Sequence, residues 1–225
     1  MSSHTAAQRP VGVFGGTYNP VHFGHLRSAL EVVEKLDLQH LSLMPCAQPP
    51  LREAPDCTAE QRVAMVELAV ADEPRLGCDA RELRRAGKSY TIDSLMELRA
   101  EHGDQRSLCM VMGCDAVLDI PRWHRWQELL DWAHIVVIAR PGWALPQQGE
   151  VAQWLERFRG DGARTLHAAP AGSIIIEQLR PLPISSTEIR QLLVTGRSPR
   201  YLMPQSVLDF IEQHQLYCPE RVFSG

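Results

Sequence analysis

The sequence predicts an α/β fold in which helices cover both faces of a doubly wound parallel sheet, with a small helical portion at the C-terminal end. Four short runs rich in Val, Ile, Leu and Met are typical of strands that are buried on both faces. They span residues 11–14, 40–44, 107–112 and 134–139. Helical periodicity follows these runs, at 24–36, 58–71, 91–102 and 126–133. This alternation predicts parallel strands joined by crossover helices.

Two of the predicted helices carry start signals. Thr58 is followed three residues later by Gln61, which is the pattern of a capping box. Thr91 precedes an apolar stripe that runs from Ile92 to Leu98, so a helix is also expected to begin there.

The segment after Arg140 adds further elements to the same fold. A Pro141–Gly142 turn and a loop to Gln148 lead to a predicted helix at 149–159, an apolar run at 172–179, and late helices near 186–195 and 204–215. The sequence contains no repeat and no clear linker. We therefore expect one domain over residues 1–225, with a core at about 10–185 and a C-terminal helical part at about 186–217.

Composition limits the possible partners and the compartment. The 23 Lys and Arg residues against 27 Asp and Glu residues give a formal net charge of −4, which argues against broad capture of nucleic acid or anionic membrane. No apolar run approaches the ~20 residues that cross a bilayer. The six cysteines form no CxxC pair and the N-terminal residues lack a signal-peptide core, so a reduced cytoplasm is expected.

The stretch GGTYNPVHFGH, from Gly15 to His25, directly follows the first predicted strand. Gly15 and Gly16 allow backbone amides to approach a ligand closely, and the next helix directs its positive N-terminal end at the same point. This predicts a phosphate-binding turn. A plain tight turn would also use two glycines, so these residues alone leave both interpretations open.

His22 and His25 are three residues apart at the predicted helix start, which places both imidazoles on one side of the helix. They could donate hydrogen bonds to one anion, or they could be structural. A zinc pair is the third alternative, but no Cys, Asp or Glu lies between Phe14 and Leu30 to complete a ligand shell. No metal-ligand set is expected in the chain.

A second motif, ISSTEIR, spans Ile184 to Arg190 ahead of a predicted helix. Hydroxyl groups, free backbone amides and a guanidinium group would meet at one helix N-terminus, which suits a second phosphate group. A serine N-cap with a solvated arginine is the structural alternative.

Together these motifs resemble the HxGH nucleotidyltransferase superfamily, which carries HxGH and a C-terminal ISSTxxR. The sequences KSYTIDSL at 88–95, MGCDAVLDIPRWHRWQELL at 112–130 and VVIARPGW at 136–143 narrow the resemblance to the bacterial nicotinate-nucleotide adenylyltransferases. The resemblance implies a Rossmann-like fold and direct in-line adenylyl transfer from ATP to nicotinate mononucleotide, without a covalent enzyme intermediate. Mg²⁺ would be held mainly by the ATP phosphates.

The resemblance also implies roles for individual residues. His22, His25 and Arg190 would be the catalytic residues. The ATP phosphates would contact Gly15, Gly16, Thr17, Ser186 and Thr187. The adenosine part would lie near Gly113, Asp115 and Arg140. The nicotinate ring and carboxylate would contact Thr91, Trp123 and His124.

Several of these positions also have structural interpretations. Asp115 could be a helix N-cap, Trp123 and Trp126 could be core aromatics, and Arg140 could be a surface residue. The basic run from Arg81 to Lys88 is expected to be a solvated loop rather than a substrate funnel.

The chain departs from the family pattern at two places. The usual GGTFDP is here GGTYNP, in which Tyr18 keeps an aromatic ring and Asn19 keeps a turn former. The family commonly has a histidine where this chain has Leu51, followed by Arg52, so no role is assigned to Leu51. A sister enzyme acting on phosphopantetheine and a non-catalytic nucleotide-binding module are the alternative functions.

Overall fold

The structure is a computed structural model that describes residues 8–48, 55–85, 87–139, 143–180 and 182–218. Its centre is an all-parallel sheet of six strands in the order β3-β2-β1-β4-β5-β6. The strands are β1 (Val11–Gly16), β2 (His40–Pro45), β3 (Leu76–Cys78), β4 (Leu108–Gly113), β5 (His134–Ala139) and β6 (Ile174–Gln178). The chain starts in the middle of the sheet and reverses direction between β1 and β4, where ligands bind in doubly wound folds.

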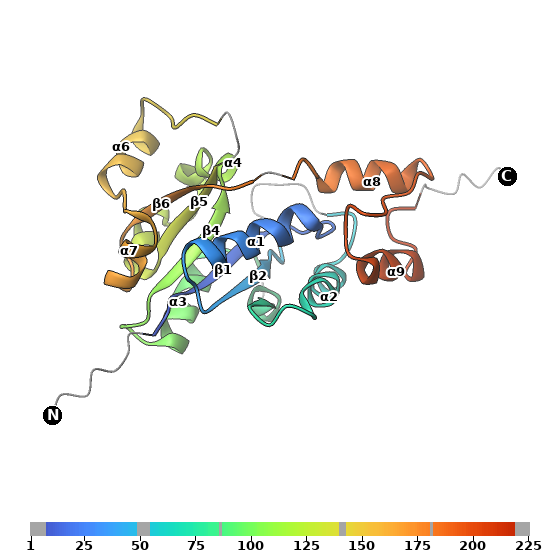
Figure 1. Ribbon diagram of the computed structural model, residues 1–225, viewed down its shortest axis with the longest axis horizontal. Helices are drawn as coiled ribbons and strands as arrows, with labels where there is room; N and C mark the ends of the chain where they lie inside the picture. Colours follow the sequence, from blue (N-terminus) through green and yellow to red (C-terminus); the bar gives the residue numbers. More distant parts are fainter. Residues whose placement is uncertain (1–7, 49–54, 86, 140–142, 181, 219–225) are drawn as a thin grey trace.

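Helices cover the sheet on both sides (Figure 1). The longer helices are α1 (Phe23–Lys35), α2 (Ala59–Val70), α3 (Thr91–His102), α6 (Glu150–Arg157), α8 (Ser186–Val194) and α9 (Gln205–Gln213). The short helices are α4 (Cys114–Val117), α5 (Leu129–Trp132) and α7 (Gly162–Ala168), with 3₁₀ turns η1 (Arg81–Arg84), η2 (Ile120–Arg122) and η3 (Trp126–Glu128). Figure 1 shows α8 and α9 together at one end of the molecule, with α9 beside α2.

Two hydrophobic cores follow from this layering. Strand residues such as Phe14 and Val111 pack with α1, α2, α8 and α9 on one side, where Val32, Val66 and Val207 are buried. Their strand neighbours Val13 and Met110 point to the other side and pack with α3 and α5. Alternate residues of a strand point to opposite faces, so each interior strand serves both cores. The predicted α/β class is confirmed.

The boundaries of the predicted elements agree in part with the structure. The four predicted strands and the run at 172–179 are all strands, and Thr58 and Gln61 form the capping box, with both of its hydrogen bonds present. The helix expected at 126–133 is instead η3 followed by α5, and Arg125, which precedes η3, has a left-handed backbone with φ 52°. Thr91 is the first residue of α3, and its N-cap is Tyr90.

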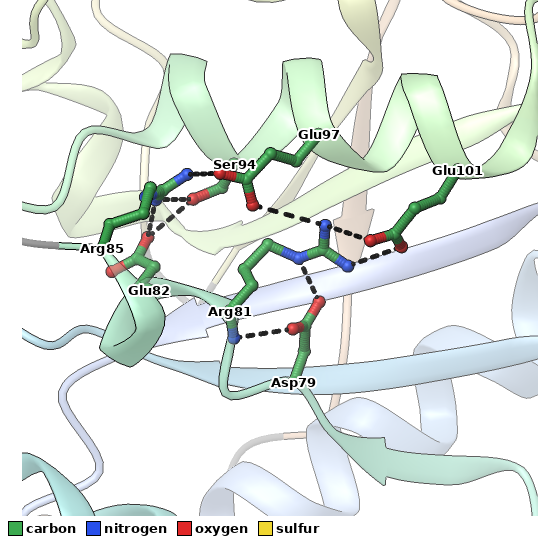
Figure 2. Close-up of polar contacts among 7 residues, drawn as sticks. All are labelled: Asp79, Arg81, Glu82, Arg85, Ser94, Glu97 and Glu101. Carbon is green, nitrogen blue, oxygen red and sulfur yellow. Dashed lines mark hydrogen bonds and ion pairs between the residues drawn. The ribbon is translucent and has the colours of Figure 1, made fainter.

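The basic run from Arg81 to Lys88 is only partly a solvated loop: Arg84 and Lys88 are exposed, but the expectation was wrong for Arg81 and Arg85. Arg81 is 8% exposed; its Nε donates to Asp79 at 2.6 Å and its terminal nitrogens donate to Glu101 at 3.0 and 3.2 Å. Arg85 donates to Glu97 at 2.8 Å and to the Ser94 hydroxyl at 2.6 Å. Figure 2 shows these contacts, which tie η1 to the side of α3.

Candidate active site

The turn between β1 and α1 is built around a buried tyrosine. Tyr18 has a left-handed backbone with φ 51°, and its hydroxyl donates back to the Phe14 carbonyl at 2.5 Å. The ring fits because residue 16 is glycine: a Cβ at Gly16 would lie 2.7 Å from the ring. The same ring meets His25 edge-on, with centroids 5.0 Å apart. The second glycine of the motif is therefore required by close packing.

The two histidines of the HxGH motif stack on each other. Their ring centroids are 3.8 Å apart, and Gly24 between them allows this, since a Cβ there would lie 2.9 Å from the His22 ring. His22 is 5% exposed, and burial lowers its pKa to about 4. Its Nδ1 has no hydrogen-bond partner within the described part of the chain. His22 is thus neutral at pH 7 and can offer an N–H to an anion.

The second motif docks onto this turn. Ser185 is the N-cap of α8 and accepts a hydrogen bond from the Glu188 amide at 3.1 Å. The Ser186 hydroxyl donates to the Pro20 carbonyl at 2.9 Å, and Arg190 donates to the Asn19 carbonyl at 2.8 Å. Ser185 is therefore a serine N-cap, as the structural interpretation proposed. Ser186 and Arg190 join the ISSTEIR motif to the β1–α1 turn, which is more than 160 residues away in the sequence.

Arg190 is held by a second contact. Its Nε lies 3.1 Å from an oxygen of Asp56, which stands just before α2. Thr187 follows Ser186 on the first turn of α8 and is exposed. The N-terminal end of α8 therefore presents hydroxyl, amide and guanidinium donors beside the β1–α1 turn.

A cleft of about 450 Å³ opens next to this turn, in the size range of small-molecule sites. Its walls contain seven of the predicted site residues: Gly15, Gly16, Thr17, Thr91, Gly113, Trp123 and His124. It lies at the carboxyl ends of β1, β2 and β4, where the strand order reverses. Tyr90 also lines it, with its ring 4.5 Å from that of His124. The aromatic residues and the glycine turn are thus parts of one cleft.

Other predicted residues lie elsewhere. Asp115 is exposed in the first turn of α4 and is not among the residues that line the cleft. Its alternative as an N-cap is wrong, because Gly113 holds that position. Trp126 is a core aromatic, as its structural interpretation proposed, and packs edge-on against Trp154. Arg140, Leu51 and Arg52 lie outside the described residues.

Arg62 is a supporting residue that the sequence gave no reason to single out. It is 1% exposed, and it donates to the carbonyls of Thr17 at 2.8 Å and Ala47 at 3.2 Å. Burial lowers the pKa of this guanidinium. In the sequence of a predicted helix, an arginine such as Arg62 cannot be distinguished from an ordinary surface residue. Only the packing of α2 under the β1–α1 turn shows that Arg62 holds the backbone of that turn.

The described residues contain no group of three or more His, Cys, Asp and Glu side chains placed to hold a metal ion. In the same part of the chain, no helix has the length and apolarity needed to cross a membrane.

A glycine turn and two helix N-termini at the switch point of a doubly wound sheet are the arrangement of nucleotide-binding α/β proteins. Comparison with protein families identifies one family within this class. Residues 13–192 match the model described as cytidylyltransferase-like, and the chain belongs to that family.

The names of individual relatives indicate a more specific class than the family description does. A Cellvibrio japonicus protein named probable nicotinate-nucleotide adenylyltransferase is 49% identical, and the match covers 92% of this chain and 98% of that protein. A protein of the same name from Aeromonas hydrophila is 48% identical, over 93% and 98% of the two chains. The resemblance that the sequence motifs indicated is confirmed.

A solved structure shares the fold. The Plasmodium falciparum nicotinic acid mononucleotide adenylyltransferase complexed with NaAD superposes with a TM-score of 0.69, over 93% of this chain and 98% of that one, at 14% identity.

Proposed function

We propose that this chain is a nicotinate-nucleotide adenylyltransferase. It joins the adenylyl group of ATP to nicotinate mononucleotide, giving nicotinate adenine dinucleotide and pyrophosphate, a step of NAD biosynthesis. The observation that carries the proposal is the meeting of two phosphate-binding motifs at Asn19 and Pro20, beside a cleft of nucleotide size. The names of relatives that are almost half identical over nearly the whole chain support it.

The proposed chemistry needs no general base. A phosphate oxygen of nicotinate mononucleotide attacks the α-phosphorus of ATP, and the bond from that phosphorus to the bridging oxygen of the leaving pyrophosphate breaks. The attacking phosphate is already an anion at neutral pH. The protein therefore has to align the two phosphates and stabilise charge in the transition state, and no covalent enzyme intermediate forms.

The phosphate contacts are assigned to the two docked motifs. We propose that His22 and His25 act on the reacting phosphates and that Arg190 holds the β- and γ-phosphates of ATP. A neutral His22 donates a hydrogen bond without adding a charge, whereas Arg190 supplies the positive charge. The remaining ATP contacts are proposed for Gly15, Gly16, Thr17, Gly113, Asp115, Arg140, Ser186 and Thr187.

The other end of the cleft suits a flat aromatic acid. Trp123 is half-buried and lines the cleft, and Thr91 begins α3, where free backbone amides attract a carboxylate. We assign the nicotinate ring to Trp123 and its carboxylate to the amides near Thr91 and His124.

ATP would enter as its Mg²⁺ complex, with the metal held mainly by phosphate oxygens and water. The proposed site supplies donors for these anionic oxygens rather than carboxylate ligands for the metal. We place the reaction in the cytoplasm, because the six cysteines are all unpaired, as expected in a reducing compartment.

The test is pyrophosphate release from Mg·ATP by the purified protein, with nicotinate mononucleotide, nicotinamide mononucleotide and phosphopantetheine in parallel. Release that is strong with the nicotinate compound alone is the expected result. Equal release with the nicotinamide compound would refute the carboxylate-binding assignment, and release with phosphopantetheine alone would identify a sister enzyme. If no pyrophosphate is released with any of the three compounds, the proposal is overturned and a non-catalytic nucleotide-binding module is the remaining alternative.

A further inference from the structure

One buried carboxylate in the cleft has no place in the mechanism above. Glu82 belongs to η1, in the segment between β3 and α3, and it lines the cleft together with Cys46 and Ser89. Its side chain is nevertheless 5% exposed. A carboxylate is rarely buried unless its oxygens are hydrogen-bonded or paired with cations, so each oxygen of Glu82 calls for a partner.

One oxygen has its partner within the protein. The Ser94 hydroxyl donates to Oε1 at 3.0 Å, and Arg85 lies 3.9 Å from the same oxygen (Figure 2). Arg85 is itself held by Glu97 at 2.8 Å. Arg81 is bound to Asp79 and Glu101. These contacts fix the orientation of the Glu82 carboxylate.

The second oxygen is unpartnered. Oε2 is buried and accepts no hydrogen bond from any residue that the structure describes. The neighbouring Cys46 thiol also interacts with the Glu82 carboxylate. Burial raises the pKa of this thiol to about 12, and the charge of Glu82 and a hydrogen bond to it contribute, so the thiol is neutral and is only a weak donor. A buried acceptor without a donor costs free energy, which a ligand with a suitable donor can recover.

The chemistry of the mononucleotide indicates which donor this is, an argument that rests on the proposed function. Its nicotinate carboxylate and its phosphate are anions at neutral pH and would repel Glu82. Its ribose hydroxyls are the hydrogen-bond donors that remain. The ribose connects the ring, assigned to Trp123, with the phosphate, assigned to the glycine turn, and Glu82 lines the same cleft as both.

We propose that Glu82 is a specificity residue whose free oxygen accepts a hydrogen bond from a ribose hydroxyl of the substrate mononucleotide. A site built to pair with a hydroxyl discriminates strongly against an analogue that lacks it. Glu82 would therefore make the cleft selective for ribonucleotide over deoxyribonucleotide substrates.

The test combines changes in the substrate with changes in the protein. We would measure kcat and KM for nicotinate mononucleotide and for its 2′-deoxy and 3′-deoxy analogues, using the unmodified protein, Glu82→Ala, Glu82→Gln and Glu101→Gln. Glu101→Gln is the matched control, because Glu101 belongs to the same ion-pair cluster but does not line the cleft. Glu82→Gln keeps an acceptor for Ser94 and stands in if the alanine variant does not fold.

The unmodified protein and Glu101→Gln should lose at least about tenfold in kcat/KM with one of the two deoxy substrates, as expected for a lost hydrogen bond to a charged group. Glu82→Ala should lose a similar factor with the full substrate and show no further loss with that analogue. If Glu82→Ala still loses as much as the unmodified protein when the hydroxyl is removed, Glu82 does not read the hydroxyl and the inference is wrong. No turnover of nicotinate mononucleotide by the unmodified protein would instead refute the proposed function.

Discussion

At the scale of single residues, His22 links the site to the pH dependence of stability. Burial lowers its pKa to about 4, whereas the unfolded chain has the ordinary value near 6.5, so the unfolded state binds more protons between these values. The contribution of a neutral His22 is therefore present above about pH 6.5 and is lost as pH falls toward 4.

We predict that lowering the pH from 7.5 to 5.5 removes about 1 kcal/mol of unfolding free energy through His22. Urea unfolding of the unmodified protein and of His22→Asn at both pH values measures this difference. Burial also lowers the pKa of His134, but His134 is present in both proteins and contributes the same pH dependence of the unfolding free energy to each. An identical loss in the two proteins would show that His22 does not carry this dependence.

Asn19 replaces the aspartate that the family pattern usually has, and the structure explains the change. Its Oδ1 accepts from the Tyr217 hydroxyl at 2.7 Å and from Cys57, while its Nδ2 donates to Asp56 at 3.3 Å. An aspartate at this buried position would place a second carboxylate oxygen against Asp56. The amide is therefore matched to its neighbour.

Asn19→Asp should lower the free energy of unfolding by about 1–3 kcal/mol, because a buried hydrogen bond becomes a contact between like charges. Asp56→Asn in the same chain restores a donor and should recover most of the loss. Urea unfolding of both single variants and the double variant forms the cycle that measures the coupling. Additive effects would contradict the matching of residues 19 and 56.

At the scale of elements, the N-terminal end of α8 is the part that completes the proposed phosphate site. Arg190 reaches the turn through one terminal nitrogen and contacts Asp56 through Nε, so its guanidinium is oriented before any ligand arrives. Its proposed partners are the β- and γ-phosphates, which are not the atoms under attack.

Arg190→Ala should mainly raise the KM for ATP, with a smaller change in kcat, because the lost contact acts in the ground state as well as in the transition state. Steady-state kinetics with varied Mg·ATP measures this. Ser185→Ala is a useful comparison, since it removes the cap of the same helix at a cost of about 1 kcal/mol of stability without removing a proposed phosphate ligand. An unchanged KM in Arg190→Ala would exclude its role with the phosphates.

At the scale of the whole molecule, the sequence predicted the features that depend on short-range patterns. Buried strands show as continuous apolar runs, and the glycine turn could be placed directly after the first strand, at the end of the sheet where ligands bind. The strand Leu76–Cys78 was missed, since its three residues are too few to form a recognisable run. The helix predicted at 126–133 consists of a 3₁₀ turn and a short α-helix, a distinction that apolar periodicity does not reveal.

The parts of the site that could not be predicted depend on contacts between distant segments. Arg62 is a supporting residue only because α2 packs beneath the turn, and Glu82 reaches the cleft only because η1 is tied to α3. In both cases a charged side chain on a polar segment is buried by tertiary structure. Local sequence predicts exposure for such residues, so the structure is needed to find them.

The measurement that tests the central claim most directly is formation of the dinucleotide, followed by mass together with pyrophosphate, from Mg·ATP and nicotinate mononucleotide. The unmodified protein should form one nicotinate adenine dinucleotide for each pyrophosphate. His25→Ala should unfold at nearly the same temperature and lower kcat about 10²-fold or more, as expected when a contact to transition-state charge is lost. Pyrophosphate without dinucleotide, or near-normal turnover by the folded His25→Ala protein, would contradict adenylyl transfer at this site.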